Sequence, residues 1–223
     1  MNCKSTRKST LIAFATLGMM GIPALAGPPL VCHRLEIGSA KSLPWGTDPA
    51  SWNQPLGDYD VAHLADETVS LLSPQTPVLV RMETLRRAAI YAGHSPEAAQ
   101  SLIVKLRARA EDAPLAMFDY GYLVEVVKEL SWTDHGSELS NVAEHLDGYP
   151  WITRSLAASG DDPEMEFAAA LVVLGRRDLK SHHEHAQKAL SGGRTDPLLA
   201  RNLATFFSGT SGDTMAVLLN KEH

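Results

Sequence analysis

The sequence predicts an all-α fold in which helical hairpins stack as a short α–α superhelix behind an irregular N-terminal arm rich in proline and tryptophan. Three observations support this prediction. Apolar residues repeat every three or four positions from Val61 onward, polar residues followed by proline recur as helix starts, and helix breakers crowd residues 27–60. With 44% hydrophobic residues among 223, the chain can bury one core.

Residues 1–26 have the pattern of a cleavable signal peptide. The basic residues at its start are Lys4, Arg7 and Lys8. An uncharged apolar run over 11–22 follows, and it is shorter than the roughly 20 residues that span a bilayer. Ala24 and Ala26 then place small side chains where signal peptidase needs them, which predicts cleavage before Gly27. We therefore expect an exported protein, periplasmic or secreted, without stable membrane insertion after cleavage; an uncleaved membrane anchor is the alternative.

Residues 27–60 predict an irregular, extended arm, because prolines and glycines interrupt every helical period. The apolar residues of this segment are Cys32, Leu35, Ile37, Leu43, Trp45 and Trp52. So many apolar side chains are unusual in a free tail. We therefore expect the arm to lie across the helices.

Residues 61–223 predict a helical-repeat domain. An amphipathic helix is expected over 78–92, with Arg81, Glu83, Arg86 and Arg87 on faces other than its apolar stripe. Ser95 before a proline begins a second helix, and a long third is expected over 114–132. The segment 136–148 fits a short helix or a loop, and helices follow over 150–158 and 213–221. Three further starts are marked by Asp162, Asp178 and Asp196.

Two of these helix starts share one pattern. Gly93–Glu97 and Gly160–Glu164 both read Gly-x-cap-Pro-Glu and lie 67 residues apart, whereas Pro163 and Pro197 are separated by 34. These spacings fit a unit of about 34 residues, the period of tetratricopeptide helix pairs.

The segment 164–197 resembles a tetratricopeptide-type repeat. Its Phe167–Leu171 run before Leu174 and Gly175 resembles the first helix and its turn, and Ala186–Leu190 before Pro197 resembles the second helix and the closing proline. The resemblance covers about a quarter of the mature chain. It implies a stacked-helix surface that holds a protein or peptide partner.

Two pairs of side chains are candidate metal ligands. His182 and His185 are i, i+3 neighbours on an expected helix and could share one ion, although a solvated polar face at a helix start is the favoured explanation. Cys32 and His33 are adjacent in the arm and offer sulfur and nitrogen ligands for zinc or copper. Both pairs need further ligands from elsewhere in the chain.

Cys32 becomes the single cysteine of the mature chain once Cys3 leaves with the signal peptide. Four states are then open to it: a buried free thiol, a disulfide that links a homodimer, a redox centre or a metal ligand. We expect the buried free thiol.

No catalytic motif stands out, because nucleophile-elbow, phosphate-loop and dinucleotide-binding patterns are all missing from the sequence. The net charge of −6 argues against binding to nucleic acid, which needs a basic face. Aromatic residues that suit either a ligand groove or the core are Tyr120, Tyr122, Trp132, Tyr149 and Trp151.

The leading prediction is an extracytoplasmic, non-catalytic module that binds protein or peptide and needs no cofactor. The alternative is a metal- or thiol-dependent envelope protein that uses Cys32, His33, His182 and His185. An enzyme of unrecognised type is a third possibility.

Overall fold

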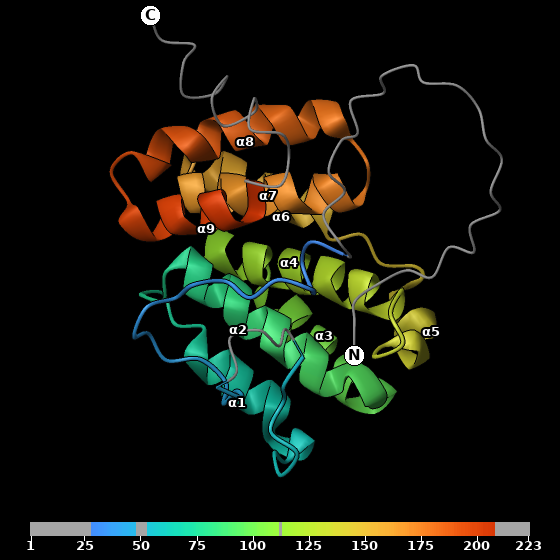
Figure 1. Cartoon of the computed structure of the whole chain (residues 1–223). Helices are drawn as coiled ribbons and strands as arrows, with labels where there is room; N and C mark the ends of the chain where they lie inside the picture. Colours follow the sequence, from blue (N-terminus) through green and yellow to red (C-terminus); the bar gives the residue numbers. More distant parts are fainter. Residues whose placement is uncertain (1–27, 48–52, 112, 208–223) are drawn as a thin grey trace, which may run out of the picture.

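The computed structural model describes residues 28–47, 53–111 and 113–207. Over these ranges the chain is all-α, with α-helices, short 3₁₀ helices and no strand (Figure 1). The α-helices are α1 (Leu64–Leu71), α2 (Val78–Tyr91), α3 (Pro96–Arg109), α4 (Pro114–Ser131), α5 (Ser140–Ala143), α6 (Tyr149–Ser159), α7 (Pro163–Gly175), α8 (Leu179–Gly193) and α9 (Pro197–Phe207). The all-α prediction is confirmed.

The predicted helix starts are confirmed atom by atom. Ser95 Oγ accepts a hydrogen bond from the Ala98 N–H at the start of α3. Asp162, Asp178 and Asp196 do the same for the first turns of α7, α8 and α9. These side chains satisfy N–H groups that have no partner within the helix. The segment expected to be a short helix or a loop contains a 3₁₀ turn and the single turn of α5.

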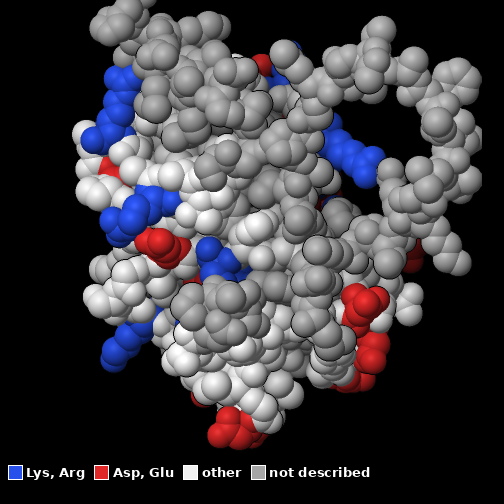
Figure 2. Space-filling model, in the orientation of Figure 1, with Lys and Arg blue, Asp and Glu red and all other residues white. Residues whose placement is uncertain are grey.

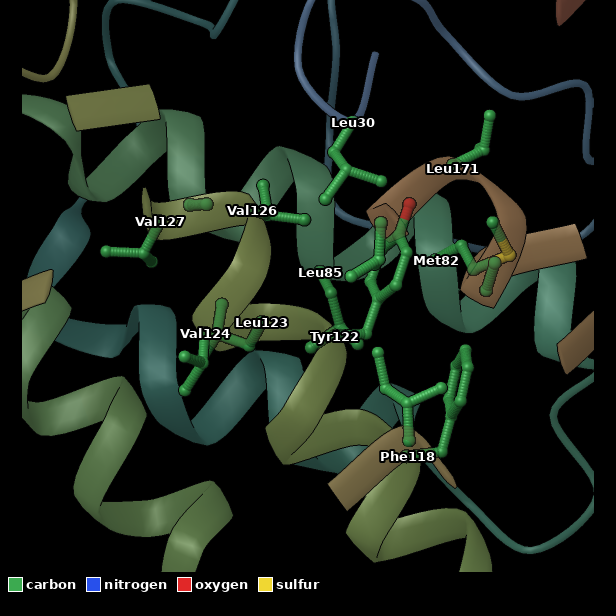
Figure 3. Close-up of a cluster of buried hydrophobic side chains, with 14 of the residues drawn as sticks. Leu30, Met82, Leu85, Phe118, Tyr122, Leu123, Val124, Val126, Val127 and Leu171 are labelled. Atoms are coloured by element: carbon green, nitrogen blue, oxygen red, sulfur yellow. The ribbon is translucent and has the colours of Figure 1, made fainter. Parts of the chain in front are cut away.

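Helix α4 lies at the centre of the molecule. It packs against α2 and α3 on one side and against α6 and α7 on the other (Figure 1). Phe118 and Tyr122 of α4 belong to one buried hydrophobic cluster with Met82 of α2 and Leu171 of α7 (Figure 3). Because α4 contacts helices both earlier and later in the chain, the stacking of successive hairpins into a superhelix stays a prediction.

The polar side chains of α2 differ from expectation. Arg81, Glu83 and Arg86 are each at most 1% exposed, so they do not form a solvated face. The physical reason is that α2 is enclosed on several sides, by α1, α4 and α7 and by the arm. The expected i, i+4 pair of Glu83 and Arg87 is present, with 2.8 Å between Oε1 and Nε.

The described part of the arm lies across the helices, as expected. Leu30, Val31, Leu35 and Leu43 are buried in the core. The arm itself is irregular, so most of its backbone groups find no partner within a helix or sheet and must bond elsewhere when buried. Side chains of the helices supply these bonds.

A buried ion cluster on α2 holds the arm. Glu83 accepts hydrogen bonds from Arg86 and Arg87 and from the Leu35 N–H, which lies 3.1 Å from its Oε2. Arg86 donates in turn to the Val31 carbonyl at 3.1 Å. Although burial alone would raise it, the pKa of Glu83 lies below its usual value because two guanidinium groups stabilise the carboxylate.

Glu129 of α4 makes a second contact with the arm. Its Oε2 accepts a 2.7 Å hydrogen bond from the Leu30 N–H. Burial raises the pKa of Glu129 to about 8, opposed by this hydrogen bond and aided by the nearby charge of Glu125. No arginine or lysine pairs with Glu129 among the described residues.

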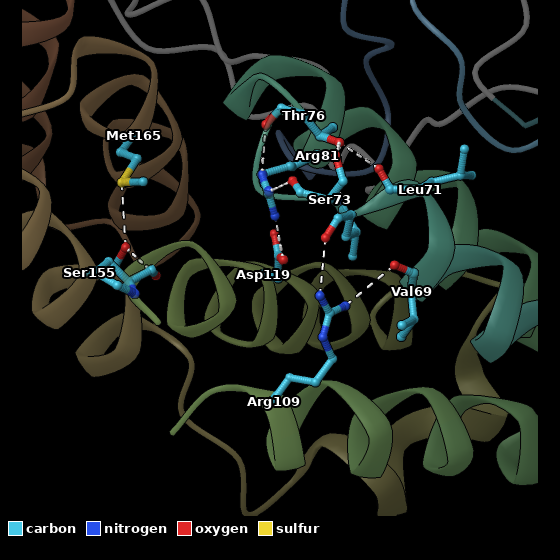
Figure 4. A network of polar contacts seen from close by, with 11 residues as sticks. Val69, Leu71, Ser73, Thr76, Arg81, Arg109, Asp119, Ser155 and Met165 are labelled. Atoms are coloured by element: carbon cyan, nitrogen blue, oxygen red, sulfur yellow. Dashed lines mark hydrogen bonds and ion pairs between the residues drawn. The ribbon is translucent and has the colours of Figure 1, made fainter. Parts of the chain in front are cut away.

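A second buried ion pair joins α2 to α4. Arg81 Nη1 lies 2.6 Å from Asp119 Oδ2, and Arg81 Nε donates to the Thr76 carbonyl in the turn before α2 (Figure 4). Arg109 of α3 donates to the Leu72 carbonyl of the same turn. Burial raises the pKa of Asp119 to about 6 despite the opposing effect of Arg81. The network fixes the α1–α2 turn against α3 and α4.

The surface seen in Figure 2 carries acidic and basic side chains in small separate groups over the described residues. Within these residues, no helix has both the length and the apolar character to cross a membrane. The predicted signal peptide, the cleavage site and the helix expected over 213–221 lie outside the described residues.

Candidate functional site

The two predicted histidine ligands of α8 have other partners. His182 Nδ1 donates to the Ala170 carbonyl at 2.8 Å, and its ring packs edge-on against Phe207. His185 Nε2 lies 2.9 Å from the Tyr149 hydroxyl, and its Nδ1 bonds to the Glu166 carboxylate. Both ring nitrogens of His185 are therefore engaged, and a metal ion would have to displace one of these partners.

The predicted ligands of the arm lie close to the core. Cys32 is disulfide-bonded, which corrects the expectation of a free thiol. The other cysteine of the sequence, Cys3, lies outside the described residues, and a Cys32-linked homodimer stays a prediction. A sulfur in a disulfide has no thiolate to offer a metal ion.

His33 packs edge-on against Phe206, with ring centroids 5.4 Å apart. Burial lowers the pKa of His33, and the positive charge of Arg86 lowers it further. The imidazole is therefore held in its neutral form. In the described ranges, no three His, Cys, Asp or Glu side chains are arranged to hold a metal ion. A zinc or copper site at these residues stays a prediction without support from the geometry.

A chain of hydrogen bonds runs through His185 and joins three helices. Tyr149 begins α6, Glu166 lies in the first turns of α7, and Lys188 of α8 donates to the second oxygen of Glu166 at 2.9 Å. Burial is the main cause that raises the pKa of Tyr149, and the charge of Asp178 adds to it. The phenol therefore keeps its proton, and its hydroxyl is hydrogen-bonded to His185.

This arrangement resembles the base and orienting carboxylate of nucleophilic sites, in which an imidazole links a hydroxyl to an acid. Such sites activate the hydroxyl by making its proton easier to remove. At Tyr149 the raised pKa works in the opposite direction. The geometry therefore favours a structural tie between α6, α7 and α8 over a catalytic one.

A cluster of aromatic and basic side chains lies where α3, α4 and α6 meet. Trp151 of α6 packs edge-on against Tyr120 of α4, with ring centroids 5.2 Å apart. The guanidinium carbon of Arg107 lies 4.3 Å from the centroid of Trp151, and that of Arg154 lies at 5.0 Å. Both distances are within the range of cation–π contacts.

The outer part of this cluster faces solvent. Trp151 and Arg107 are half-buried, and Arg154 is exposed. Val104 lies one turn before Arg107 on the same face of α3 and is 55% exposed. We call Val104, Arg107, Trp151 and Arg154 the Trp151 surface.

The five aromatic residues singled out from the sequence have different environments. Tyr120 and Tyr122 are buried, Tyr149 and Trp151 are half-buried, and Trp132 is 62% exposed at the end of α4. They do not form one groove. Sequence reasoning did not pair Arg107 with Trp151, because that contact joins α3 to α6. Arg154 lies three residues after Trp151 on α6, so its contact with the indole follows from helical spacing.

No protein-family model, curated protein or solved structure matches this chain. The tetratricopeptide resemblance therefore stays a prediction.

Proposed function

We propose that this protein is an exported, non-catalytic module that binds another protein or a peptide. The observation that carries this proposal is the Trp151 surface. Tryptophan, tyrosine and arginine are the residue types that contribute most to binding energy at protein interfaces. Here Trp151, Tyr120 and Arg107 are brought together from three helices, and part of the cluster stays open to solvent.

Rigidity also supports the proposal. Trp151 packs on Tyr120 inside and on two guanidinium groups outside, so its ring is held in place before any partner arrives. An ordered anchor loses little side-chain entropy when it binds. By comparison, Leu179 is 59% exposed on α8 and belongs to no such cluster.

A site-specific cross-linking experiment tests this function. A photoreactive phenylalanine analogue is introduced at Val104 in one variant and at Leu179 in the other, since both positions are exposed helix sites. After irradiation in cells of the native host, we expect one discrete adduct from position 104 and none from position 179. Equal labelling of both variants, or no adduct at position 104, would contradict the proposal.

A further inference from the structure

We propose that the Trp151 surface recognises a carboxylate-rich peptide segment, through the guanidinium groups of Arg107 and Arg154. This inference rests on the proposed binding function and names the chemistry of the partner. It starts from an unusual arrangement, in which two cationic groups share one indole ring. Like charges repel, so a site that holds two of them together becomes more stable when an anion binds.

The geometry leaves hydrogen-bond donors available. A cation–π contact leaves the N–H donors of a guanidinium group free to form hydrogen bonds in the plane of the group. Arg154 is exposed and makes no hydrogen bond or ion pair with a described residue. Its planar fork of donors matches the two oxygens of a carboxylate.

Among the described residues, Arg107 has one competing ion-pair partner. Its Nη1 lies 3.0 Å from Oε1 of Glu111 on the same helix. The side chain of Arg107 is 41% exposed and that of Glu111 is 70% exposed, so this i, i+4 pair is screened by solvent, contributes little free energy and can yield to an incoming carboxylate. The bond to Glu111 also shows that Arg107 presents a donor to a carboxylate at the surface.

The arrangement favours a peptide over a nucleic acid. Binding to a phosphate backbone requires a broad basic face, whereas the chain carries a net charge of −6. Two arginines that contact one ring offer donors to more than one carboxylate. The exposed Val104 adds an apolar contact, so the expected segment combines at least two Asp or Glu residues with one aliphatic residue.

The test uses a fluorescein-labelled, glutamate-rich peptide with one leucine, and the same peptide with every glutamate replaced by glutamine. Fluorescence anisotropy measures binding of each peptide to the full chain at low and at physiological salt. We expect the glutamate peptide to bind about tenfold more tightly than the glutamine peptide, and to weaken as salt rises.

Two charge reversals of equal size distinguish binding at the Trp151 surface from attraction of the peptide by the net charge of the protein. Arg154→Glu should weaken binding of the glutamate peptide about tenfold or more, and Lys180→Glu, at an exposed position of α8, should change it less than about twofold. Arg154→Lys keeps the charge but loses the planar fork, so an intermediate loss is expected. Circular dichroism would reveal whether Arg154→Glu disturbs folding. If it does, the milder Arg154→Lys variant still tests the site.

Other outcomes would overturn the inference. Equal loss in Arg154→Glu and Lys180→Glu would show that net charge alone attracts the peptide. Tighter, Arg154-dependent binding of a labelled single-stranded oligonucleotide would assign the surface to nucleic acid. If no peptide binds while position 104 still cross-links in cells, the carboxylate chemistry is wrong and the interaction function stands. If no peptide binds and position 104 gives no adduct, both the carboxylate chemistry and the interaction function are wrong.

Discussion

Replacement of Glu129 by glutamine should remove a large part of the pH dependence of stability. Glu129 lies in the core with a pKa of about 8 against an ordinary value of 4.5, chiefly because burial disfavours the charged carboxylate. The folded state therefore holds a proton that the unfolded state releases. Stability from this group is present below about pH 4.5 and is lost as pH rises toward 8.

The size of this loss follows from the difference between the two pKa values. Each pH unit between 4.5 and about 8 corresponds to about 1.4 kcal/mol, so the full loss reaches about 5 kcal/mol.

Urea denaturation of the parent and of Glu129→Gln, at intervals from pH 4.5 to pH 8.5, measures this effect. Glutamine can still accept the Leu30 N–H bond but cannot ionise. The free energy of unfolding of the variant, relative to the parent, should rise by about 1.4 kcal/mol per pH unit until about pH 8. Asp119 and Glu164 also have raised pKa values, of about 6 and about 7, and they affect both proteins alike. Glu97→Gln at an exposed site is the matched control. A parent–variant difference that does not change with pH would refute the burial argument.

Three further predictions follow from the described contacts and from the leader. Glu83→Gln leaves Arg86 buried without an ionised partner and should lower the free energy of unfolding by about 3 kcal/mol in urea melts at pH 7; an unchanged midpoint would contradict the role of this cluster. Gly121→Ala places a Cβ 2.6 Å from the backbone oxygen of Gly148, so it should cost about 1–3 kcal/mol, whereas Gly57→Ala, with open space around it, should be nearly neutral. Mass spectrometry of the protein from its native host should find a chain that begins at Gly27, and a stable species that retains residues 1–26 would contradict export.

Local sequence signals predicted the helices well because the interactions that begin a helix join residues only a few positions apart. A capping residue such as Asp162 satisfies N–H groups two and three positions away, so its effect is visible in a short window of sequence. The boundaries at Pro96, Pro114, Pro163 and Pro197 follow from the same reasoning, since proline is tolerated in a first turn.

The polar residues of α2 could not be placed in this way. Hydrophobic periodicity assigns Glu83 and Arg86 to a solvent face, and only the contact with Leu35 and Val31, about 50 residues earlier, buries them. Sequence reasoning missed Glu166 for a related reason. Its partner His185 lies on another helix, 19 residues later, so no short window of sequence pairs the two side chains.

The Trp151 surface was only partly predictable. Trp151 and Tyr120 were recognised as residues that suit either a ligand groove or the core, but the packing of Arg107 on the indole depends on how closely α3 and α6 approach. The approach of α6 to α4 depends likewise on Gly121 and Gly148, where the absence of side chains allows the backbones to meet. A single sequence shows these glycines without showing which pair is in contact.

The arm explains why charged residues interrupt the apolar stripes of α2 and α4. An irregular segment that is buried needs acceptors and donors for its backbone, and helix backbones have none to spare. Side chains must supply them: Glu83 and Glu129 accept from Leu35 and Leu30, and Arg86 donates to Val31. The ionised Glu83 and Arg86 would be more costly in the core without the arm, because buried charges are stable only when they are paired and hydrogen-bonded. The arm therefore needs the helix side chains to bond its backbone, and these side chains need the arm as their buried partner. The arm is part of the folded unit.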